Sequence, residues 1–179
     1  MMYVDLDFAQ LFRAHYDEIA SYLRRRQVDS NTADEIAQVT FNEAWRTRSG
    51  FDPLRGTPRS WLFGIAVNLM RRHFRTERRR HAAYARAASR NAVPDEPFDE
   101  LSISKLDGRT LSGLVAPILA ALPQGQFEVV TLHCWTSLTH AEIAASLGIP
   151  EGTVKRRLSD ARKTVRIRLS AYLLEPSDG

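Results

Sequence analysis

Cysteine is almost absent from this chain of 179 residues. The one cysteine, Cys134, has no partner for an internal disulfide, which is typical of a protein in a reducing compartment. The first residues lack the basic start and apolar run of a signal peptide, and no stretch is apolar enough to span a bilayer. We therefore expect a soluble cytoplasmic protein that is not inserted in a membrane.

Lysine is also scarce, because the chain has three: Lys105, Lys155 and Lys163. Arginine therefore carries nearly all of the positive charge, and the formal net charge is +4 with a pI near 9.6. The planar guanidinium group suits bidentate contacts with phosphate better than an ammonium group does. Apolar residues make up 44% of the chain, which argues against wholesale disorder and allows one domain or two small ones.

The segment from Thr139 to Arg166 is predicted to form two helices joined by a tight turn. Thr139 and Glu142 have the spacing of a capping box at the start of the first helix. Gly148 suits a left-handed exit from that helix, and Pro150 suits the first turn of the next one.

The second helix of this segment is apolar on one side. Its apolar positions recur at helical spacing: Val154, Leu158, Ala161 and Val165. Most of its cations fall outside that stripe: Lys155, Arg156, Arg157, Arg162, Lys163 and Arg166. This pattern is typical of a helix-turn-helix whose second helix enters the major groove of DNA. The alternative is an ordinary helical hairpin with a solvated basic face.

Two further helices are predicted near the N-terminus. Apolar residues at helical spacing indicate the first over residues 7–26. Thr32 and Glu35 have the spacing of a second capping box, which would open a helix over residues 33–47.

Within the second of these helices, Phe41 and Trp45 form a stripe apart from the main apolar face, with Asp34 and Gln38 beside them. A bulky apolar and acidic strip outside the core is typical of a surface that docks another protein. Periodicity alone is equally consistent with Phe41 and Trp45 being part of the core.

A third helix is predicted after a loop over residues 49–56, with Thr57 as its cap and Pro58 at its first position. Residues 71–90 then contain eight arginines and one acidic residue, Glu77. Arginines mixed with aromatic rings suit a nucleic-acid strand, because arginines hold phosphates while rings stack on bases. The alternative is a solvated, partly disordered arginine tail.

The composition changes over residues 91–107, which are acidic, contain Pro94 and Pro97, and show little apolar periodicity. This composition indicates a linker. We therefore expect an all-α protein of two small helical domains, residues 1–80 and 113–175, joined by a flexible acidic linker over residues 81–112.

His133, Cys134 and His140 are candidates for a metal or catalytic site. Zinc needs a fourth ligand, and the sequence has no paired cysteine motif. A Cys–His nucleophile pair needs an orienting partner and an oxyanion hole, and neither is indicated. We expect no catalytic residue, metal, cofactor or small-molecule substrate, and a packed or partly buried thiol at Cys134.

Two blocks of the sequence carry a family resemblance. The N-terminal block comprises ADEIAQVTFNEAW (33–45), FDPLRGTPRSWLFGIAVN (51–68) and the arginines within residues 71–75. The C-terminal block comprises ALPQGQFEVVTL (121–132) and AEIAASLGIPEGTVKRRLSDAR (141–162). Both blocks, in this order and separated by a linker, resemble a bacterial sigma factor of the sigma-70 type, in the small extracytoplasmic-function (group IV) branch.

The resemblance implies a protein that binds core RNA polymerase, directs it to promoters and is controlled by an anti-sigma factor. The helix over residues 33–45 would then dock on the clamp helices of the polymerase. The implied core polymerase-binding residues are Asp34, Gln38, Phe41 and Trp45.

Promoter recognition would be divided between the two blocks. Residues 51–75 would melt and capture the minus-ten element, with the loop before Trp61 holding an unstacked base. The implied minus-ten contacts are Arg59, Trp61, Asn68, Arg71, Arg72 and Arg75. The helix from Pro150 would read the minus-thirty-five element through Thr153, Lys155, Arg156, Arg157 and Arg162.

Several positions depart from the family's usual pattern. An acid is usual where Arg72 stands and frequent where Val39 stands, a small serine is common where Arg157 stands, and a glycine is frequent near residues 135–136. The sequence also leaves a rival interpretation, a helix-turn-helix regulator that binds operator DNA without acting as a polymerase subunit. An enzyme such as a basic nuclease lacks a convergent set of acid, base or metal-binding residues, so we expect none.

Overall fold

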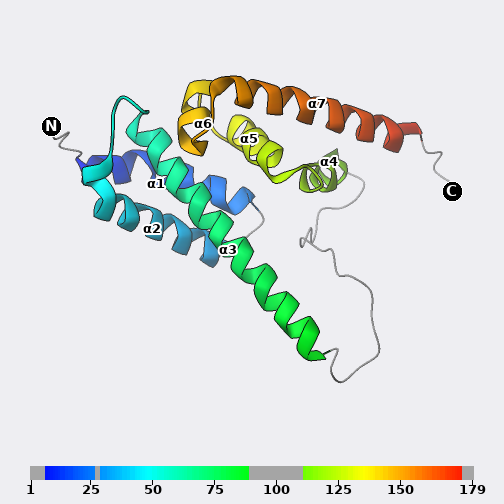
Figure 1. Ribbon diagram of the computed structural model, residues 1–179, viewed down its shortest axis with the longest axis horizontal. Coiled ribbons are helices and arrows are strands. Elements are labelled where there is room, and N and C mark those ends of the chain that lie inside the picture. Colours follow the sequence, from blue (N-terminus) through cyan, green and yellow to red (C-terminus); the bar gives the residue numbers. More distant parts are fainter. Residues whose placement is uncertain (1–6, 27–28, 89–110, 175–179) are drawn as a thin grey trace. The chain divides into compact units, whose positions relative to one another are not determined.

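The computed structural model describes residues 7–26, 29–88 and 111–174, and the regular elements within these ranges are all helices. The expectation of an all-α protein is therefore confirmed. The described residues fall into two compact units (Figure 1). The first contains residues 7–26, 29–52 and 61–88, and the second contains residues 53–60 and 111–174.

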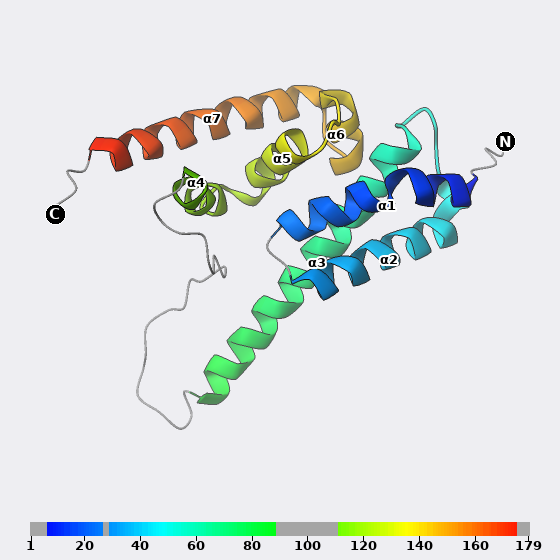
Figure 2. The same ribbon diagram turned by 180° about the vertical axis from the view of Figure 1, so that it is seen from behind.

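The first unit begins with two antiparallel helices that lie side by side, α1 (Phe8–Arg25) and α2 (Ser30–Thr47) (Figures 1 and 2). Asp7 caps α1, because its carboxylate accepts a hydrogen bond from the backbone N–H of Gln10 at 3.0 Å. A short 3₁₀ turn, η1 (Arg48–Gly50), follows α2.

The cap of α2 differs from the expected one. Asp29 accepts hydrogen bonds from both the hydroxyl and the backbone N–H of Thr32, and these hold the pKa of Asp29 below its usual value. The predicted capping box of Thr32 and Glu35 is therefore wrong. The helix begins at Ser30, because an aspartate is as good an N-cap as threonine or better and stands three residues earlier.

The core of the first unit forms between α1, α2 and α3 (Pro58–Ala88). The rings of Tyr22 and Phe63 meet edge to face at 5.6 Å. Other buried apolar residues are Ile19, Leu23, Ala33, Ile36, Ala37, Ala44, Leu62, Ala66, Val67 and Met70. Full burial of one such large side chain contributes about 1.5–3 kcal/mol.

Helix α3 starts as predicted and ends later than predicted. Thr57 caps it, because the backbone N–H of Ser60 donates to the Thr57 hydroxyl at 3.1 Å. The helix then continues to Ala88, into the range predicted as linker. Most of that predicted linker, including its acidic residues 91–107, lies outside the described residues, and the domain boundaries stay a prediction.

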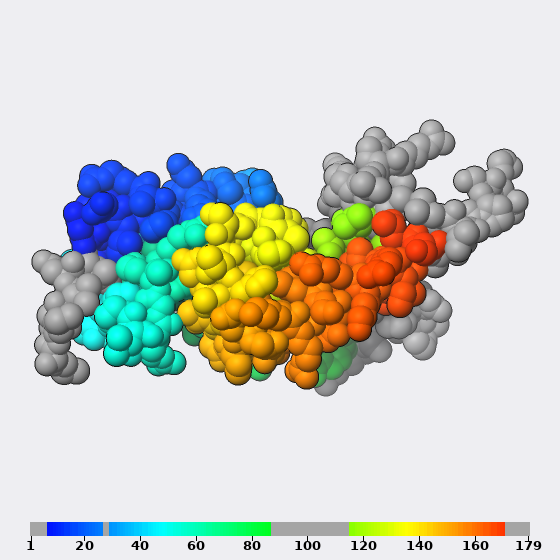
Figure 3. Space-filling model, turned by 90° about the horizontal axis from the view of Figure 1, so that it is seen from above, coloured from blue at the N-terminus to red at the C-terminus, as the bar shows by residue number. Residues whose placement is uncertain are grey.

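The second unit contains α4 (Leu111–Ala120), α5 (Gln124–Trp135), α6 (His140–Leu147) and α7 (Glu151–Leu174). Figure 3 shows the orange surface of α7 beside the yellow surface of α5 and α6. The helices share one core, which buries Ile118, Leu122, Val129, Leu132, Leu138, Ile143, Ala144, Val154, Leu158 and Ala161. These residues include most of the apolar stripe predicted for α7.

The turn between α6 and α7 has the predicted conformation. Gly148 is left-handed, with φ 64° and ψ 37°, and it ends α6. Helix α7 begins at Glu151, directly after Pro150, whose carbonyl accepts a hydrogen bond from the backbone N–H of Thr153 at 2.9 Å. The two helices therefore form the helix-turn-helix that the sequence predicts.

The side chain of Cys134 is exposed, so the expected packed or partly buried thiol is wrong. Leu132 faces the core of the second unit, and a residue two positions further along a helix points to nearly the opposite side. Among the described helices, none has the length and apolar character needed to cross a bilayer.

Candidate functional site

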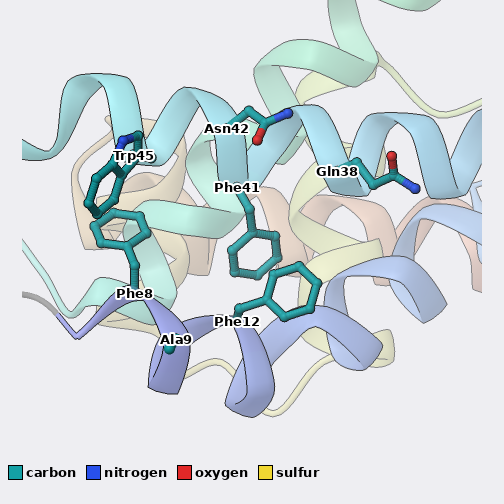
Figure 4. A pocket seen from close by; sticks show the side chains of 7 residues that line it. All are labelled: Phe8, Ala9, Phe12, Gln38, Phe41, Asn42 and Trp45. Carbon is teal, nitrogen blue, oxygen red and sulfur yellow. The ribbon is translucent and has the colours of Figure 1, made fainter.

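An aromatic groove lies between α1 and α2 in the first unit (Figure 4). Its volume is about 380 Å³, and it is lined by Phe8, Ala9 and Phe12 of α1 and by Gln38, Phe41, Asn42 and Trp45 of α2. Phe8 meets Trp45 edge to face at 5.0 Å, and Phe12 meets Phe41 at 5.0 Å. Two aromatic pairs from two helices therefore form the walls of one groove.

The groove leaves much apolar surface in contact with solvent. Trp45 is 52% exposed and Phe12 is 45% exposed, whereas Phe41 is only 6% exposed. The guanidinium carbon of Arg48 lies 4.0 Å from the centroid of the Trp45 ring, a distance that permits a cation–π interaction. A groove that exposes both a tryptophan and a phenylalanine is the kind of surface on which protein partners anchor.

The four implied core polymerase-binding residues thus have different environments. Gln38 and Trp45 are exposed on the groove, and Asp34 is held by an ion pair with Arg24 at 2.7 Å. Phe41 lies beneath the ring of Phe12 and belongs to the core more than to the surface. The structure therefore brings three of the four to the accessible face of α2.

Sequence reasoning did not assign Phe8, Phe12 or Asn42 to this surface. The two phenylalanines belong to the apolar residues whose spacing predicts the first helix. Their i, i+4 spacing matches that of Phe41 and Trp45, and this match was the available signal. Only the pairing of α1 with α2 shows that the two aromatic pairs meet.

One face of α3 carries four of the implied minus-ten residues: Asn68, Arg71, Arg72 and Arg75. Their spacing of three or four residues puts them on the same side of the helix. Arg71 donates a hydrogen bond to the Asn68 side-chain oxygen at 3.2 Å, and Arg72 and Arg75 are exposed. The cluster combines an amide that can hydrogen-bond a base edge with several phosphate-binding groups.

The other two implied minus-ten residues lie elsewhere on α3. Trp61 is half-buried, and its ring packs 5.3 Å from the ring of Phe51, so it supports the loop before the helix. Arg59 belongs to the second unit, where it donates to the Ser137 hydroxyl at 2.8 Å and lies 4.0 Å from Glu142.

The capping box at the start of α6 is complete. The Thr139 hydroxyl accepts a hydrogen bond from the Glu142 backbone at 3.2 Å, and the Glu142 carboxylate accepts one from the Thr139 backbone at 2.9 Å. Partial burial opposes ionisation of Glu142, but hydrogen bonds from Thr139 and Thr57 and the charge of Arg59 hold its pKa below the usual value. The helix-turn-helix therefore has a firmly anchored first helix.

The N-terminal half of α7 presents the implied minus-thirty-five residues. Lys155, Arg156 and Arg162 are exposed, and Thr153 is half-buried. Lys155 forms an ion pair with Glu151 at 2.8 Å, which holds the pKa of Glu151 below its usual value. Arg156 lies one position further along, on the side opposite the buried stripe.

Arg157 occupies a different position from the other cations of α7. It is half-buried, and its guanidinium lies against Gly125 at the start of α5 so closely that a methyl group on Gly125 would stand 2.8 Å from the Arg157 Cζ atom. This contact connects α5 with α7. It leaves less of the guanidinium available to a base edge.

A small basic cluster joins α5, α6 and α7. The rings of His133 and His140 are 5.3 Å apart. Burial, together with the charges of His140 and Arg162, lowers the pKa of His133. Across the described residues, no three histidine, cysteine, aspartate or glutamate side chains are grouped so that they could hold a metal ion.

Comparison with known proteins matches both units. The sequence matches Sigma-70 region 2 over residues 11–80 and Sigma-70 region 4 over residues 115–165. The chain is 30% identical to the RNA polymerase sigma factor CnrH of Cupriavidus metallidurans, over 92% of this chain and 87% of CnrH. It is also 30% identical to the ECF RNA polymerase sigma factor SigL of Mycobacterium tuberculosis, over 90% of each chain.

A solved structure of CnrH in complex with the cytosolic domain of CnrY also resembles this chain. The TM-score is 0.62 at 29% sequence identity, and the match covers 92% of this chain and 88% of CnrH. The groove-lining residues other than Phe8 and Ala9 lie within the matched region 2, and the helix-turn-helix as far as residue 165 lies within the matched region 4. The chain therefore belongs to the sigma-70 family of RNA polymerase sigma factors, in the extracytoplasmic-function (ECF) branch.

Proposed function

We propose that this sigma factor binds core RNA polymerase through the α1–α2 face and directs it to promoters through α3 and α7. The observation that carries the proposal is the exposed aromatic groove beside Gln38 on α2, in a chain that also holds a capped basic helix-turn-helix. A DNA-binding regulator needs the second feature alone. The first feature requires a protein partner.

The polymerase-binding residues are Asp34, Gln38, Phe41 and Trp45, and each has its own role. Trp45 supplies the large exposed anchor, and Gln38 supplies hydrogen bonds at the side of the groove. Asp34 is oriented by its ion pair with Arg24. Phe41 acts indirectly, because its buried ring supports Phe12 from below.

The minus-ten element is bound by residues at the start and along the face of α3. Asn68, Arg71, Arg72 and Arg75 contact the melted strand as one cluster. Trp61 holds the preceding loop in place through Phe51, and Arg59 lies on the first turn of the helix. Melting exposes bases and phosphates together, and this face offers groups for both.

The minus-thirty-five element is read by the N-terminal half of α7. The first residues of a recognition helix contact base edges, so Thr153, Lys155 and Arg156 are placed for this role. Arg162 lies further along the helix and suits a phosphate. Arg157 contributes chiefly by holding α7 against α5, and from that position its guanidinium can also approach the backbone of the duplex.

Regulation by an anti-sigma factor is part of the proposal. CnrH has been solved with the cytosolic domain of CnrY, so a protein of this fold presents surfaces to a second protein. We also infer that residues 1–80 bind both the polymerase and the minus-ten element, and that residues 113–175 bind the minus-thirty-five element. Both domains act in the cytoplasm. The protein is not an enzyme, because RNA synthesis belongs to the polymerase.

Run-off transcription with purified core polymerase tests this function. Genomic DNA retrieved with the protein supplies candidate promoters. We expect a transcript from a defined start when both the protein and core polymerase are present, and none with either alone. If no candidate promoter yields a specific transcript while the protein still binds the DNA, the operator-binding regulator is the correct interpretation.

A docking variant sharpens this test. Replacing Gln38 and Trp45 together by alanine should weaken core binding by about tenfold or more, since loss of an interface anchor costs about 2 kcal/mol. Arg46→Ala is the matched control, because Arg46 is exposed on α2 and does not line the groove. Equal affinity of the double variant and the control would refute the α2 docking surface.

A further inference from the structure

The basic face of α3 does not end with the minus-ten cluster. Arg78, Arg79 and Arg86 continue it at the same spacing of three to four residues, with the small residue Ala82 between them. We call the complete set the arginine ridge: Arg71, Arg72, Arg75, Arg78, Arg79 and Arg86. From Arg71 to Arg86 the ridge is about 22 Å long, which corresponds to about seven base pairs of duplex.

The ridge stands on a part of α3 that has no role in the core. Met70 is the last fully buried residue of the helix, and the side chains described from Arg71 to Arg86 are exposed or only partly buried. Figures 1 and 2 both show the green C-terminal part of α3 projecting past α1 and α2. Packing therefore does not explain why this stretch is helical or basic.

The acidic residue of this stretch lies off the ridge. Glu77 occupies the other side of the helix, where it pairs with Arg80 at 3.0 Å. Within the described part of the chain, no ion pair joins Arg75, Arg78 or Arg79 to a carboxylate. The positive charge of Arg75, Arg78 and Arg79 is consequently not neutralised by an ion pair within the described residues.

Like charges at i, i+3 and i, i+4 positions destabilise a helix. The ridge contains several such pairs, including Arg71 with Arg75 and Arg75 with Arg79. A row of phosphates along the ridge would relieve this repulsion at each position. Duplex DNA presents phosphates in continuous rows, whereas a protein partner would have to provide a matching line of acids.

We propose that Arg78, Arg79 and Arg86 bind the phosphate backbone of duplex DNA immediately next to the melted minus-ten stretch. This inference rests on the proposed function, because the cluster from Asn68 to Arg75 sets where the DNA lies. Arg86 lies beyond residues 11–80, the part of the chain that matches Sigma-70 region 2. The contact of Arg86 would thus extend the stretch of promoter that this sigma factor holds beyond the part bound by region 2 alone.

The test uses holoenzyme reconstituted from core polymerase and the full chain, and a promoter fragment that the wild-type holoenzyme transcribes. Affinity for the fragment is measured over a series of salt concentrations. In the variant R78A/R79A/R86A we expect the slope of log affinity against log salt to fall by about 2.7, or 0.9 for each phosphate contact. Across a fourfold rise in salt, wild type should then lose about 40-fold more affinity than the variant does.

The matched control removes the same charge away from the ridge. R13A/R25A/R80A replaces three exposed arginines, two on α1 and one on the opposite side of α3. Alanine favours helix, so both variants should keep their helical circular dichroism. Equal slopes in the ridge variant and wild type, or equal losses in the ridge variant and the control, would overturn the proposal.

Uncharged methylphosphonate links in the DNA backbone can locate the contact between the ridge and the duplex. Methylphosphonate links placed one at a time in the duplex beside the minus-ten element should weaken wild-type binding at a few positions and leave the ridge variant unaffected there. Equal weakening of both proteins at every position would also refute the contact. Specific transcription by the wild-type holoenzyme without the expected salt and methylphosphonate effects would leave the proposed function intact. It would refute only the contact of Arg78, Arg79 and Arg86 with duplex DNA.

Discussion

The hydroxyl group of Thr139 holds the N-terminus of the helix-turn-helix. It accepts a hydrogen bond from the Glu142 backbone N–H, while the Glu142 carboxylate accepts one from the Thr139 backbone N–H. Thr139→Ala should destabilise α6 by about 1 kcal/mol, because a lost N-cap leaves a backbone donor without its partner. Amide hydrogen exchange in α6 should then be about fivefold faster.

Thr164→Ala is the control for this substitution. The Thr164 hydroxyl bonds the Asp160 carbonyl within α7, a bond that contributes little to helix stability. The amide hydrogen-exchange rates of α6 in Thr164→Ala should stay within about twofold of those in wild type. Unchanged exchange in Thr139→Ala would show that the capping box does not limit the opening of α6.

Local chemistry predicts some residues well and others poorly. Thr139, Glu142 and Gly148 follow from spacing, because caps and left-handed exits depend on near neighbours in the chain. Asp29 was overlooked, because two caps competed three residues apart. The contact of Arg157 with Gly125 was not predictable, since it joins residues on α5 and α7 that only packing brings together.

Among the helices, the packing of α5, α6 and α7 around His133 should become less stable in acid. Burial and the charges of His140 and Arg162 lower the pKa of His133 in the folded protein, so the unfolded chain binds a proton at higher pH. The free energy of unfolding should therefore fall as the pH drops through the ordinary histidine range near about 6.5. The loss is complete below the lowered pKa of the folded state.

His133→Gln separates this effect from that of the other histidines. The variant cannot gain the proton, so its stability should change less than that of wild type between neutral pH and about pH 5.5. The midpoint of thermal unfolding, followed by circular dichroism at each pH, gives the comparison. Parallel curves for the two proteins would contradict a role for His133.

The start of helix α3 was predictable from the sequence, whereas its end was not. Its start was predicted from Thr57 and Pro58. Its length was not, because the side chains of residues 81–86 are exposed and residues 81–112 were assigned to the linker. Alanine and arginine have high helix propensity, and elongation of an existing helix costs far less than nucleation, so α3 continues to Ala88.

For the whole molecule, polymerase binding and promoter reading should be separable. Arg156→Ala should relax the preference for the minus-thirty-five element by about 1–3 kcal/mol while leaving core affinity unchanged. Gln38→Ala should lower core affinity and leave the promoter preference as it is. The two effects should add in the double variant, because the residues share no partners.

Competition binding to core polymerase and transcription from mutated promoters measure the two properties independently. If Arg156→Ala changes only the salt dependence of binding and not its sequence preference, Arg156 is a phosphate contact. A large non-additive term in the double variant would mean that the two sites are coupled.

Short-range sequence patterns predicted most of the helices, the capping box of Thr139 and Glu142, the helix-turn-helix and the family, because all of these depend on residues close together in the chain or on short motifs. Tertiary structure decided what each aromatic and each arginine does. Phe41 and Trp45 could not be assigned from periodicity, and only the packing of α1 on α2 buries Phe41 and leaves Trp45 exposed beside Phe8. Spacing along one helix defines a face, but the neighbouring element decides whether that face is core or surface.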